Sequence, residues 1–367
     1  MRKAKSGIMK RIYLLIIVLF ISRSIYSQNL SAYHDYRDKF YIFDNGKAIF
    51  AEPLPVISYK IGNKSLAYVT NSGVIKVYND GNFTKLSESV NEYLVTDNYI
   101  VYDLYGILKV FDNGKIVSLS NNYSRYSAGD SVIAYYDKSK KIFYAYYNGE
   151  ITELEDAIAK DPISNFNAAD NIIAFKSNNN YLKAFYKGES FDLVLAETPL
   201  YYKVGRNIVA FINKSYGSFN VFYKGEVIKL SSYIPESYFT ADNIVCWVDY
   251  SGEFKIFDSG EINIISSYAP DEYFVDDKII VYHENDFLKA YYKNTIYTIE
   301  NYIPVKVKTD YGRILYFDNQ NRLKLFENGE VKILSNENIN FIDINNNVIN
   351  FNEGVNSSKV YYNGVLY

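Results

Sequence analysis

One seven-residue pattern of apolar and polar positions recurs ten times along this 367-residue chain. An apolar residue is followed most often by Lys, then by a small or β-branched residue, Phe or Tyr, two variable residues and usually Gly. The copies occupy residues 40–46, 75–81, 108–114, 143–149, 182–188, 219–225, 254–260, 288–294, 323–329 and 358–364. Successive copies end 33 to 39 residues apart. A fixed period of this length is the signature of a tandem-repeat fold.

Each copy of the pattern predicts a β-strand that ends in a tight hairpin turn. Aromatic and β-branched residues favour strands, and Asn-Gly, Asp-Gly or Lys-Gly supplies the positive φ angles of such turns. Asn294 replaces the Gly in one copy, and Asn tolerates that conformation best among the other residues. A second strand follows each turn, as at 226–230, and another hairpin precedes each copy, as at 237–248. The repeat unit is therefore four short antiparallel strands.

The apolar content of the strands predicts how the units pack. Strands such as 279–282 are continuously apolar rather than alternating, which is typical of sheets buried on both faces. Face-to-face packing of four-stranded sheets is the arrangement of a β-propeller, and the 40 tyrosines suit the space between blades. Nine complete units run from Val56 onward, after a leading hairpin at about 40–50. We predict an all-β fold: a single large β-propeller of about nine or ten compact four-stranded blades.

Two other all-β arrangements fit the same repeats. The array is long enough for two smaller propellers of about five blades each, or for an irregular β-array. No linker rich in Pro, Gly or Ser interrupts the repeats, which favours one ring.

The first 27 residues predict an export signal. A basic segment precedes the apolar run 12–21, and small residues follow it. The run is shorter than the roughly 20 residues that cross a bilayer, so we interpret 1–27 as a signal peptide and 28–367 as the repeat domain. A retained N-terminal anchor is the alternative. No later segment is apolar enough to span a membrane, which predicts a periplasmic protein or, alternatively, a secreted or cell-surface one.

The charge balance excludes some classes of partner. Removal of residues 1–27 lowers the count of Lys and Arg from 39 to 33 against 42 Asp and Glu. An acidic domain argues against nucleic acid and anionic membrane surfaces as partners, because both require basic patches. The single cysteine, Cys246, lies in an apolar run and is expected to be buried, without a disulfide.

The sequence offers little for catalysis or cofactor binding. Only two histidines occur, and we interpret His283 as a surface turn residue. We predict no catalytic residues, no metal and no cofactor, since there is no Gly-x-Ser-x-Gly motif and no phosphate-binding glycine loop.

Aspartates recur between the first two strands of the units and could form a cation-binding mouth, but Asp is also an ordinary turn residue. They are Asp97, Asp130, Asp170, Asp242, Asp277 and, shifted by one residue, Asp310, whereas Arg206 and Asn346 hold the same place elsewhere.

The lysine in the pattern has a structural explanation as well as a functional one. A ring of ammonium groups could bind an anionic partner. A Lys stem packed along neighbouring Tyr rings with its head in solvent needs no partner, and we favour this interpretation. The lysines are Lys76, Lys109, Lys183, Lys255, Lys289, Lys324 and Lys359.

The spacing between copies of the pattern is longer than usual at two places. The two longest spacings contain residues 153–162 and 194–200. Insertions in repeat arrays fall in loops on one face, often the binding face. The candidate partner-binding residues are Glu155, Asp156, Lys160, Asp161, Pro162, Glu197, Thr198 and Pro199.

The array resembles propeller-type proteins of the Gram-negative cell envelope, and the dipeptide Ser27-Gln28 resembles export signals in the phylum that uses type IX secretion. The resemblance implies a non-enzymatic protein-interaction module that docks on, or closes, the periplasmic face of an outer-membrane translocon. Two alternatives remain: a glycan-binding or glycan-cleaving propeller, such as a glycoside hydrolase or lyase, and a secreted adhesin.

Overall fold

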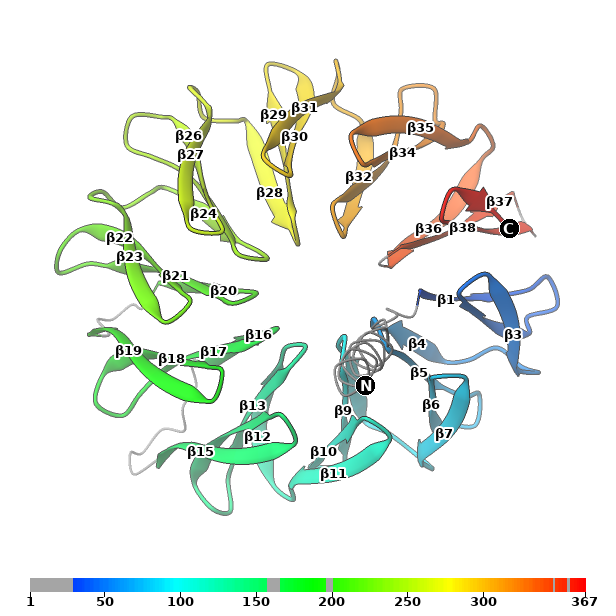
Figure 1. The fold of residues 1–367 in the computed structure, drawn as a ribbon. Helices are drawn as coiled ribbons and strands as arrows, with labels where there is room; N and C mark the ends of the chain where they lie inside the picture. The colour runs from blue at the N-terminus through cyan, green and yellow to red at the C-terminus, as the bar shows by residue number, and fades with distance from the viewer. Residues whose placement is uncertain (1–28, 157–165, 196–200, 346, 355–356) are drawn as a thin grey trace, which may run out of the picture.

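Ten antiparallel sheets follow one another around a ring in the computed structural model of this chain (Figure 1). The structure describes residues 29–156, 166–195, 201–345, 347–354 and 357–367. Each sheet contains only strands that are consecutive in the sequence. We call the sheets blades 1 to 10 in chain order. The prediction of a single large propeller is confirmed, and the alternatives of two smaller rings or an irregular array are wrong.

Blade 1 has three strands among the described residues, and each of the other nine blades has four. Blades 1 to 5 consist of β1 (Leu30–His34), β2 (Phe40–Asp44), β3 (Lys47–Glu52); β4 (Ser58–Ile61), β5 (Ser65–Val69), β6 (Ile75–Asn79), β7 (Asn82–Ser87); β8 (Glu92–Val95), β9 (Tyr99–Leu104), β10 (Ile107–Asp112), β11 (Lys115–Ser120); β12 (Tyr123–Ala128), β13 (Val132–Asp137), β14 (Ile142–Tyr147), β15 (Glu150–Asp156); β16 (Phe166–Ala169), β17 (Ile172–Lys176), β18 (Tyr181–Tyr186) and β19 (Glu189–Leu195).

Blades 6 to 10 consist of β20 (Tyr202–Gly205), β21 (Ile208–Asn213), β22 (Ser218–Tyr223), β23 (Glu226–Ser231); β24 (Tyr238–Thr240), β25 (Ile244–Val248), β26 (Phe254–Asp258), β27 (Glu261–Ser266); β28 (Glu272–Asp276), β29 (Ile279–Glu284), β30 (Phe287–Tyr292), β31 (Thr295–Glu300); β32 (Val305–Asp310), β33 (Arg313–Phe317), β34 (Leu323–Glu327), β35 (Glu330–Ser335); β36 (Ile339–Asn345), β37 (Val348–Glu353), β38 (Ser357–Tyr362) and β39 (Val365–Leu366). The described residues contain no helix that could cross a membrane.

The repeated pattern forms the third strand of blades 2 to 10 and the middle strand, β2, of the three described in blade 1. In Figure 1 the first strand of a blade, such as β20, lies nearest the centre, and the fourth, such as β23, lies at the rim. The Asn-Gly turns adopt the expected left-handed conformation, with φ of 47° at Asn45 and 88° at Gly46. Asn294 has a φ of 60°, as its place in the pattern predicted. The leading hairpin becomes β2 and β3, and β1 adds a third strand beside it.

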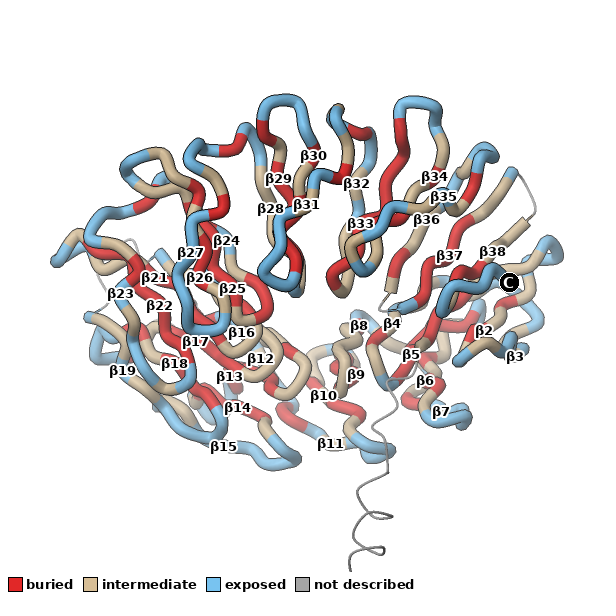
Figure 2. The backbone as a smooth tube through the Cα atoms, turned by 45° about the horizontal axis from the view of Figure 1, so that its top comes forward, coloured by how far each residue is buried: buried red, intermediate tan, exposed pale blue. Residues whose placement is uncertain are grey.

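The two middle strands of each blade carry the core. Every residue of β13 is buried, and β33 is buried throughout as well. Figure 2 shows this as buried segments along the middle strands and exposed segments at the turns and the rim. Apolar clusters fill the space between successive blades, for example Val132, Phe143 and Phe175 between blades 4 and 5. Burial of both sheet faces explains the continuously apolar strands.

A second feature of the repeat determines how neighbouring blades contact each other. In some copies the aromatic residue of the pattern is Tyr. Its hydroxyl then donates a hydrogen bond to an acidic residue of the preceding blade, at the end of the strand that the pattern forms there. The pairs are Tyr78 with Asp44, Tyr146 with Asp112, Tyr291 with Asp258 and Tyr361 with Glu327, at 2.7 to 3.3 Å.

Where the aromatic residue is Phe, the preceding blade usually has Tyr in place of the acid, and the two rings meet edge to face. The pairs are Tyr147 with Phe185, Tyr186 with Phe222, Tyr223 with Phe257 and Tyr362 with Phe43, with ring centroids 5.4 to 6.0 Å apart. Two Phe residues differ: Phe111 follows a blade with Asn79 at this position, and Phe326 meets Tyr297 of the preceding blade edge to face, with ring centroids 5.2 Å apart. Eight of the ten aromatic residues are thus matched to the equivalent position one blade earlier.

The junction of blade 10 with blade 1 closes the ring with the fewest buried apolar side chains. Its cluster of buried residues contains only Phe43, Val348 and Val360. Polar contacts supplement it: the Asn350 side chain donates to the carbonyl of Ala32 at 2.8 Å, and that amide is buried. No sheet shares strands from both ends of the described chain, so side chains alone hold this junction.

Three interpretations of single residues can be compared with the structure. Cys246 is fully buried, as expected. The interpretation of His283 as a surface turn residue is wrong, because it lies within β29 with its side chain 14% exposed and Nδ1 3.6 Å from a Glu272 carboxylate oxygen. The prediction that the lysine heads lie in solvent is wrong for five of the seven, which form ion pairs: Lys76, Lys183, Lys255, Lys289 and Lys324. The acids lie at the rim-strand ends or hairpin turns beside these lysines; Glu52, for example, accepts hydrogen bonds from Lys76 and Tyr68.

We expect the Tyr-to-acid contact to stabilise the ring measurably. Tyr146→Phe removes the hydrogen bond to the Asp112 carboxylate and should lower the free energy of unfolding by about 1–2 kcal/mol. Tyr147→Phe is the matched control, because that ring packs edge to face on Phe185 and should cost less than about 0.5 kcal/mol. Urea denaturation measures both, and equal losses would contradict the assigned role of the hydroxyl.

Candidate functional site

The turns between the first and second strands gather side chains at one end of the central channel. The residues at the tips of these turns are Asn63, Asp97, Asp130, Asp170, Arg206, Asp242, Asp277 and Tyr311. Tyr311, rather than Asp310, occupies the equivalent place in blade 9, because Asp310 still pairs with Arg313 as the last residue of β32. The one-residue shift expected for Asp310 is therefore present. Asn346 lies outside the described residues.

Arg206 connects blade 6 to four other blades at this channel mouth. Its Nη2 lies 2.8 Å from Asp130 Oδ2 and 3.6 Å from Asp97 Oδ2. Its Nη1 lies 3.9 Å from Asp242 Oδ2, and its Nε contacts the Asp170 carboxylate. These four aspartates come from blades 4, 3, 7 and 5. One guanidinium is thus surrounded by carboxylates that the sequence placed in separate repeats.

A second contact crosses the mouth on the other side. The Asn63 side-chain amide of blade 2 donates to Asp97 Oδ2 and to the hydroxyl of Tyr311, each at 2.5 Å. Tyr311 belongs to blade 9, so the turns of blades 2, 3 and 9 meet here. Together with Arg206, these contacts draw the tips of seven blades into one polar cluster.

Burial and charge shift the ionisation of this cluster. Burial, together with the charge of Asp130, raises the pKa of Asp97 to about 6. Burial also raises the pKa of Asp277, with the neighbouring Asp276 adding to the effect. Burial disfavours the charged form of Arg206, but Asp130 and Asp242 outweigh it and raise its pKa. The guanidinium therefore stays charged, and the raised pKa of Asp97 favours its protonated form as the pH falls.

Arg206 determines the chemistry of the mouth. The cluster borders a cavity of about 360 Å³ whose lining includes Asp97, Asp130, Asp170 and Arg206. No group of three or more His, Cys, Asp and Glu residues among the described ranges is arranged to hold a metal ion. The guanidinium occupies the space between the carboxylates and neutralises part of their charge. What remains is a polar cavity lined by amides, carboxylates, the partly exposed guanidinium and Lys64.

Lysines on the inner strands join neighbouring blades along the channel wall. Lys60 Nζ donates to the carbonyl of Tyr93 at 2.7 Å, and Lys203 Nζ donates to that of Tyr238 at 2.6 Å. Lys308 makes the same contact with Ile342 at 2.8 Å. In each case the acceptor is a backbone group of the next blade's first strand, which has no sheet partner on that edge.

The residues predicted to bind a partner lie elsewhere. Glu155 and Asp156 end β15, where Glu155 Oε1 accepts a hydrogen bond from the backbone N–H of Asn178 at 3.3 Å and Oε2 lies 3.9 Å from Lys183 Nζ. These contacts attach the end of blade 4 to blade 5. Lys160, Asp161, Pro162, Glu197, Thr198 and Pro199 lie outside the described residues. Their role in partner binding stays a prediction.

The role of Arg206 was not predicted, because in the sequence this residue counted only as evidence against a metal site. The available signal was the substitution of a long cation at a position where five other repeats have Asp. Once the repeats are known to form a closed ring, a single Arg among aspartates at equivalent positions is expected to act as their counter-ion.

Comparison with known proteins gives a family and distant structural likenesses. The model of one protein family, a 10-bladed beta propeller domain, matches residues 24–367. No curated protein matches the sequence. Among solved structures, the computationally designed Ika8 protein is 15% identical, with a TM-score of 0.37 over 74% of this chain and 96% of that chain.

Two natural proteins have lower similarity. Prp20p from Saccharomyces cerevisiae is 10% identical, with a TM-score of 0.33 over 56% of this chain and 72% of that chain. PorZ, a surface component of the type-IX secretion system of Porphyromonas gingivalis, is 10% identical, with a TM-score of 0.25 over 88% of this chain and 62% of that chain.

We expect Arg206→Met to destabilise the protein in a pH-dependent way. Without the guanidinium the aspartates repel one another, so the loss should be about 1–3 kcal/mol at pH 8, allowing for the partial exposure of the site. The loss should shrink towards pH 5, because the variant takes up more protons than the parent as its carboxyl groups are neutralised.

Urea denaturation between pH 5 and pH 8 measures this difference. Arg37→Met is the control, since that guanidinium lies over the exposed ring of Tyr36 and its loss should change stability by less than about 0.5 kcal/mol. A loss for Arg206→Met that does not vary with pH would refute the electrostatic role.

Proposed function

The chain belongs to the family of 10-bladed β-propeller domains, and we propose that it is a non-enzymatic protein-interaction module of the cell envelope. A ring of this kind presents a broad surface on a scaffold in which every blade contacts two neighbours. Tyr-rich surfaces suit protein recognition, because the rings supply contact area at a small entropic cost.

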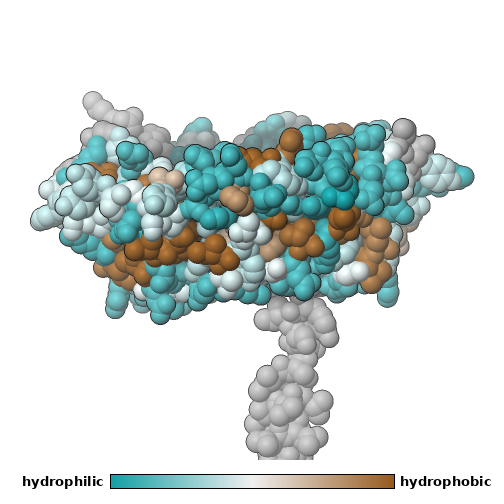
Figure 3. Space-filling model, turned by 90° about the horizontal axis from the view of Figure 1, so that it is seen from above, coloured by the Kyte–Doolittle hydropathy of each residue, from teal (hydrophilic) through white to brown (hydrophobic). Residues whose placement is uncertain are grey.

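The observation that carries this proposal is an apolar belt around the rim. Outer strands of most blades expose large aliphatic or aromatic side chains that are 41% to 54% accessible. The belt consists of Phe50, Phe83, Ile116, Ile151, Val227, Ile262, Ile264, Ile296, Val331 and Ile333. Seen edge-on in Figure 3, hydrophobic side chains form a broken band along the rim. Extended apolar surface on a protein exterior marks interaction sites.

We propose that the partner is a protein complex of the outer membrane, reached from the periplasm. The basic, apolar and small-residue segments of 1–27 support export, and the Ser27-Gln28 dipeptide makes a type IX translocon the specific candidate. A belt that follows the rim suits a partner lying alongside or around the ring. In this proposal the protein docks on, or closes, the periplasmic face of the translocon.

A glycan-cleaving enzyme is the second candidate, and one observation favours it. Asp97 and Asp130 face the same cavity, and the pKa of Asp97 is raised to about 6, a property that general acids require. In that case the protein should release reducing ends from cell-envelope polysaccharide, and Asp97→Asn should abolish the release. Asp192→Asn, at an exposed carboxylate on β19, is the control. Activity that survives Asp97→Asn, or no activity in the parent, excludes this candidate.

The belt predicts the outcome of affinity purification. We expect the tagged protein to recover a stoichiometric partner from native envelopes, and the double variant Ile262→Asp with Ile264→Asp to lose at least about 90% of it, because charge opposes burial of the belt. Tyr216→Asp is the control, since Tyr216 is 83% exposed in the turn between β21 and β22, away from the belt.

Recovery of the parent protein only as a free monomer would contradict the proposal. Release of most of the protein into the medium would favour the adhesin alternative over periplasmic residence.

A further inference from the structure

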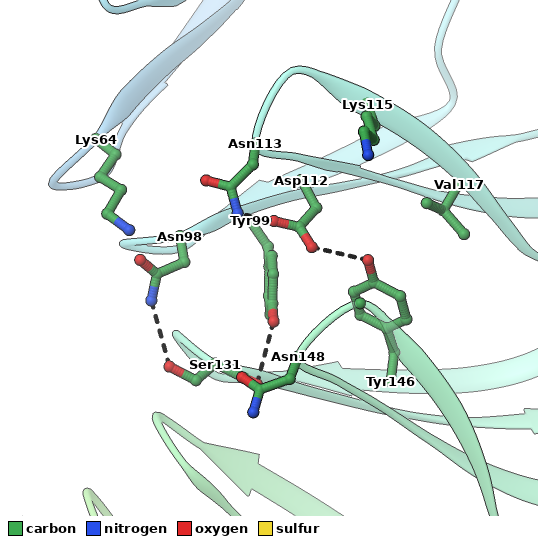
Figure 4. A pocket seen from close by; sticks show the side chains of 11 residues that line it. Lys64, Asn98, Tyr99, Asp112, Asn113, Lys115, Val117, Ser131, Tyr146 and Asn148 are labelled. Atoms are coloured by element: carbon green, nitrogen blue, oxygen red, sulfur yellow. Dashed lines mark hydrogen bonds between the residues drawn. The ribbon is translucent and has the colours of Figure 1, made fainter.

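Blades 3 and 4 are separated by a polar cleft on the same side of the ring as the channel mouth. It has a volume of about 610 Å³, within the range of small-ligand sites. Figure 4 shows Lys64 from blade 2, Asn98, Asn113 and Lys115 from blade 3, and Asn148 from blade 4 around it. Lys64, Asn98 and Ser131 also line the cavity at the channel mouth, so the two cavities share a wall.

The cleft lies where the repeats differ from one another. Tyr99 begins the second strand of blade 3 at a position that is Ile or Val in most other blades. Its hydroxyl donates to the carbonyl of Ser131 at 3.2 Å, and its ring meets Tyr146 edge to face at 5.6 Å. Lys115 begins the outer strand, where five later blades have Glu. Tyr99 and Lys115 together make the junction of blades 3 and 4 chemically different from the junctions of the later blades.

The lining of the cleft has two lysines and one carboxylate, which leaves a net positive charge. Neither Lys64 nor Lys115 forms an ion pair within the described ranges. The one carboxylate of the lining, Asp112, already accepts hydrogen bonds from the Tyr146 hydroxyl and the Asn113 side-chain amide, each at 2.8 Å. Two ammonium groups therefore face the cleft in a protein whose overall charge is negative.

The neutral groups of the lining favour a ligand with several hydroxyls. Asn98, Asn113 and Asn148 contribute carboxamides, each of which combines donor and acceptor atoms. The Asn98 amide nitrogen makes only a long contact of 3.3 Å with the Ser131 hydroxyl, and Asn148 has no side-chain hydrogen bond among the described residues. Carboxamides can hydrogen-bond to adjacent hydroxyls of a ligand, whereas the lysine ammonium groups can form an ion pair with a carboxylate.

From this combination we propose that the cleft binds an acidic sugar unit of the uronic acid type. The sugar hydroxyls bond to the carboxamides of Asn98, Asn113 and Asn148. The carboxylate pairs with Lys115, while Lys64 lies on the opposite side of the cleft (Figure 4). This binding site is separate from the apolar belt and does not depend on the proposed envelope partner.

The test is calorimetric titration of the full chain with trigalacturonic acid. We expect saturable binding, and a reduction in affinity of at least about tenfold for Lys115→Glu, which installs the residue that later blades have. Lys47→Glu is the matched control, because Lys47 is exposed at the equivalent position of blade 1 and should leave affinity unchanged. Thermal midpoints of the parent and both variants establish that each is folded.

Several outcomes would overturn the proposal. They are no binding of trigalacturonic acid at millimolar concentration, equal losses for Lys115→Glu and Lys47→Glu, equal affinity for a neutral trisaccharide, and equal affinity for a hexa-aspartate peptide. The last two would show that the cleft selects neither for the carboxylate nor for the sugar. Loss of partner recovery through the apolar belt leaves this result unaffected, so the two proposals fail independently.

Discussion

Hydrogen-bonded sheets end at the edge of each blade, so the contact of one blade face with the next holds the whole ring together. Every sheet is made of consecutive strands, and the single cysteine is buried and free. Burial of apolar side chains on both faces of each sheet supplies the cohesion. The junction of blades 10 and 1 has only a small apolar cluster, so less cohesion comes from apolar burial there. Hydrogen bonds such as that from the Asn350 side chain to the Ala32 carbonyl supplement it.

Because the blades are similar, their junctions need features that match each one to its neighbours. An acid opposite Tyr, as in Asp112 with Tyr146, and Tyr opposite Phe, as in Tyr147 with Phe185, are two such pairings. An acid opposite Phe would lose its hydrogen-bond donor and be partly desolvated. The residues at these positions therefore vary together along the chain, and the variation maintains the fold rather than a site.

Both candidate polar sites lie where the repeats depart from this common plan. Arg206 replaces an aspartate and gathers the carboxylates of other blades around itself. Tyr99 and Lys115 make the junction of blades 3 and 4 polar and cationic. The apolar belt is different, because it repeats around the rim and is not explained by packing within the ring. A scaffold built by repetition thus carries one extended apolar surface and two candidate sites.

The spacing of the repeats and their Asn-Gly turns determined the strands, the hairpins and the approximate number of blades, because strand register and turn conformation are local properties. The ion pairs of the repeat lysines and the position of His283 inside β29 required the structure, since both depend on side chains from neighbouring strands. The contacts of Arg206 with Asp97 and Asp130 could be found only from the tertiary structure. Those residues are 76 or more positions apart in the sequence. Only closure of the ring, which fixes the distance across the channel, brings them together.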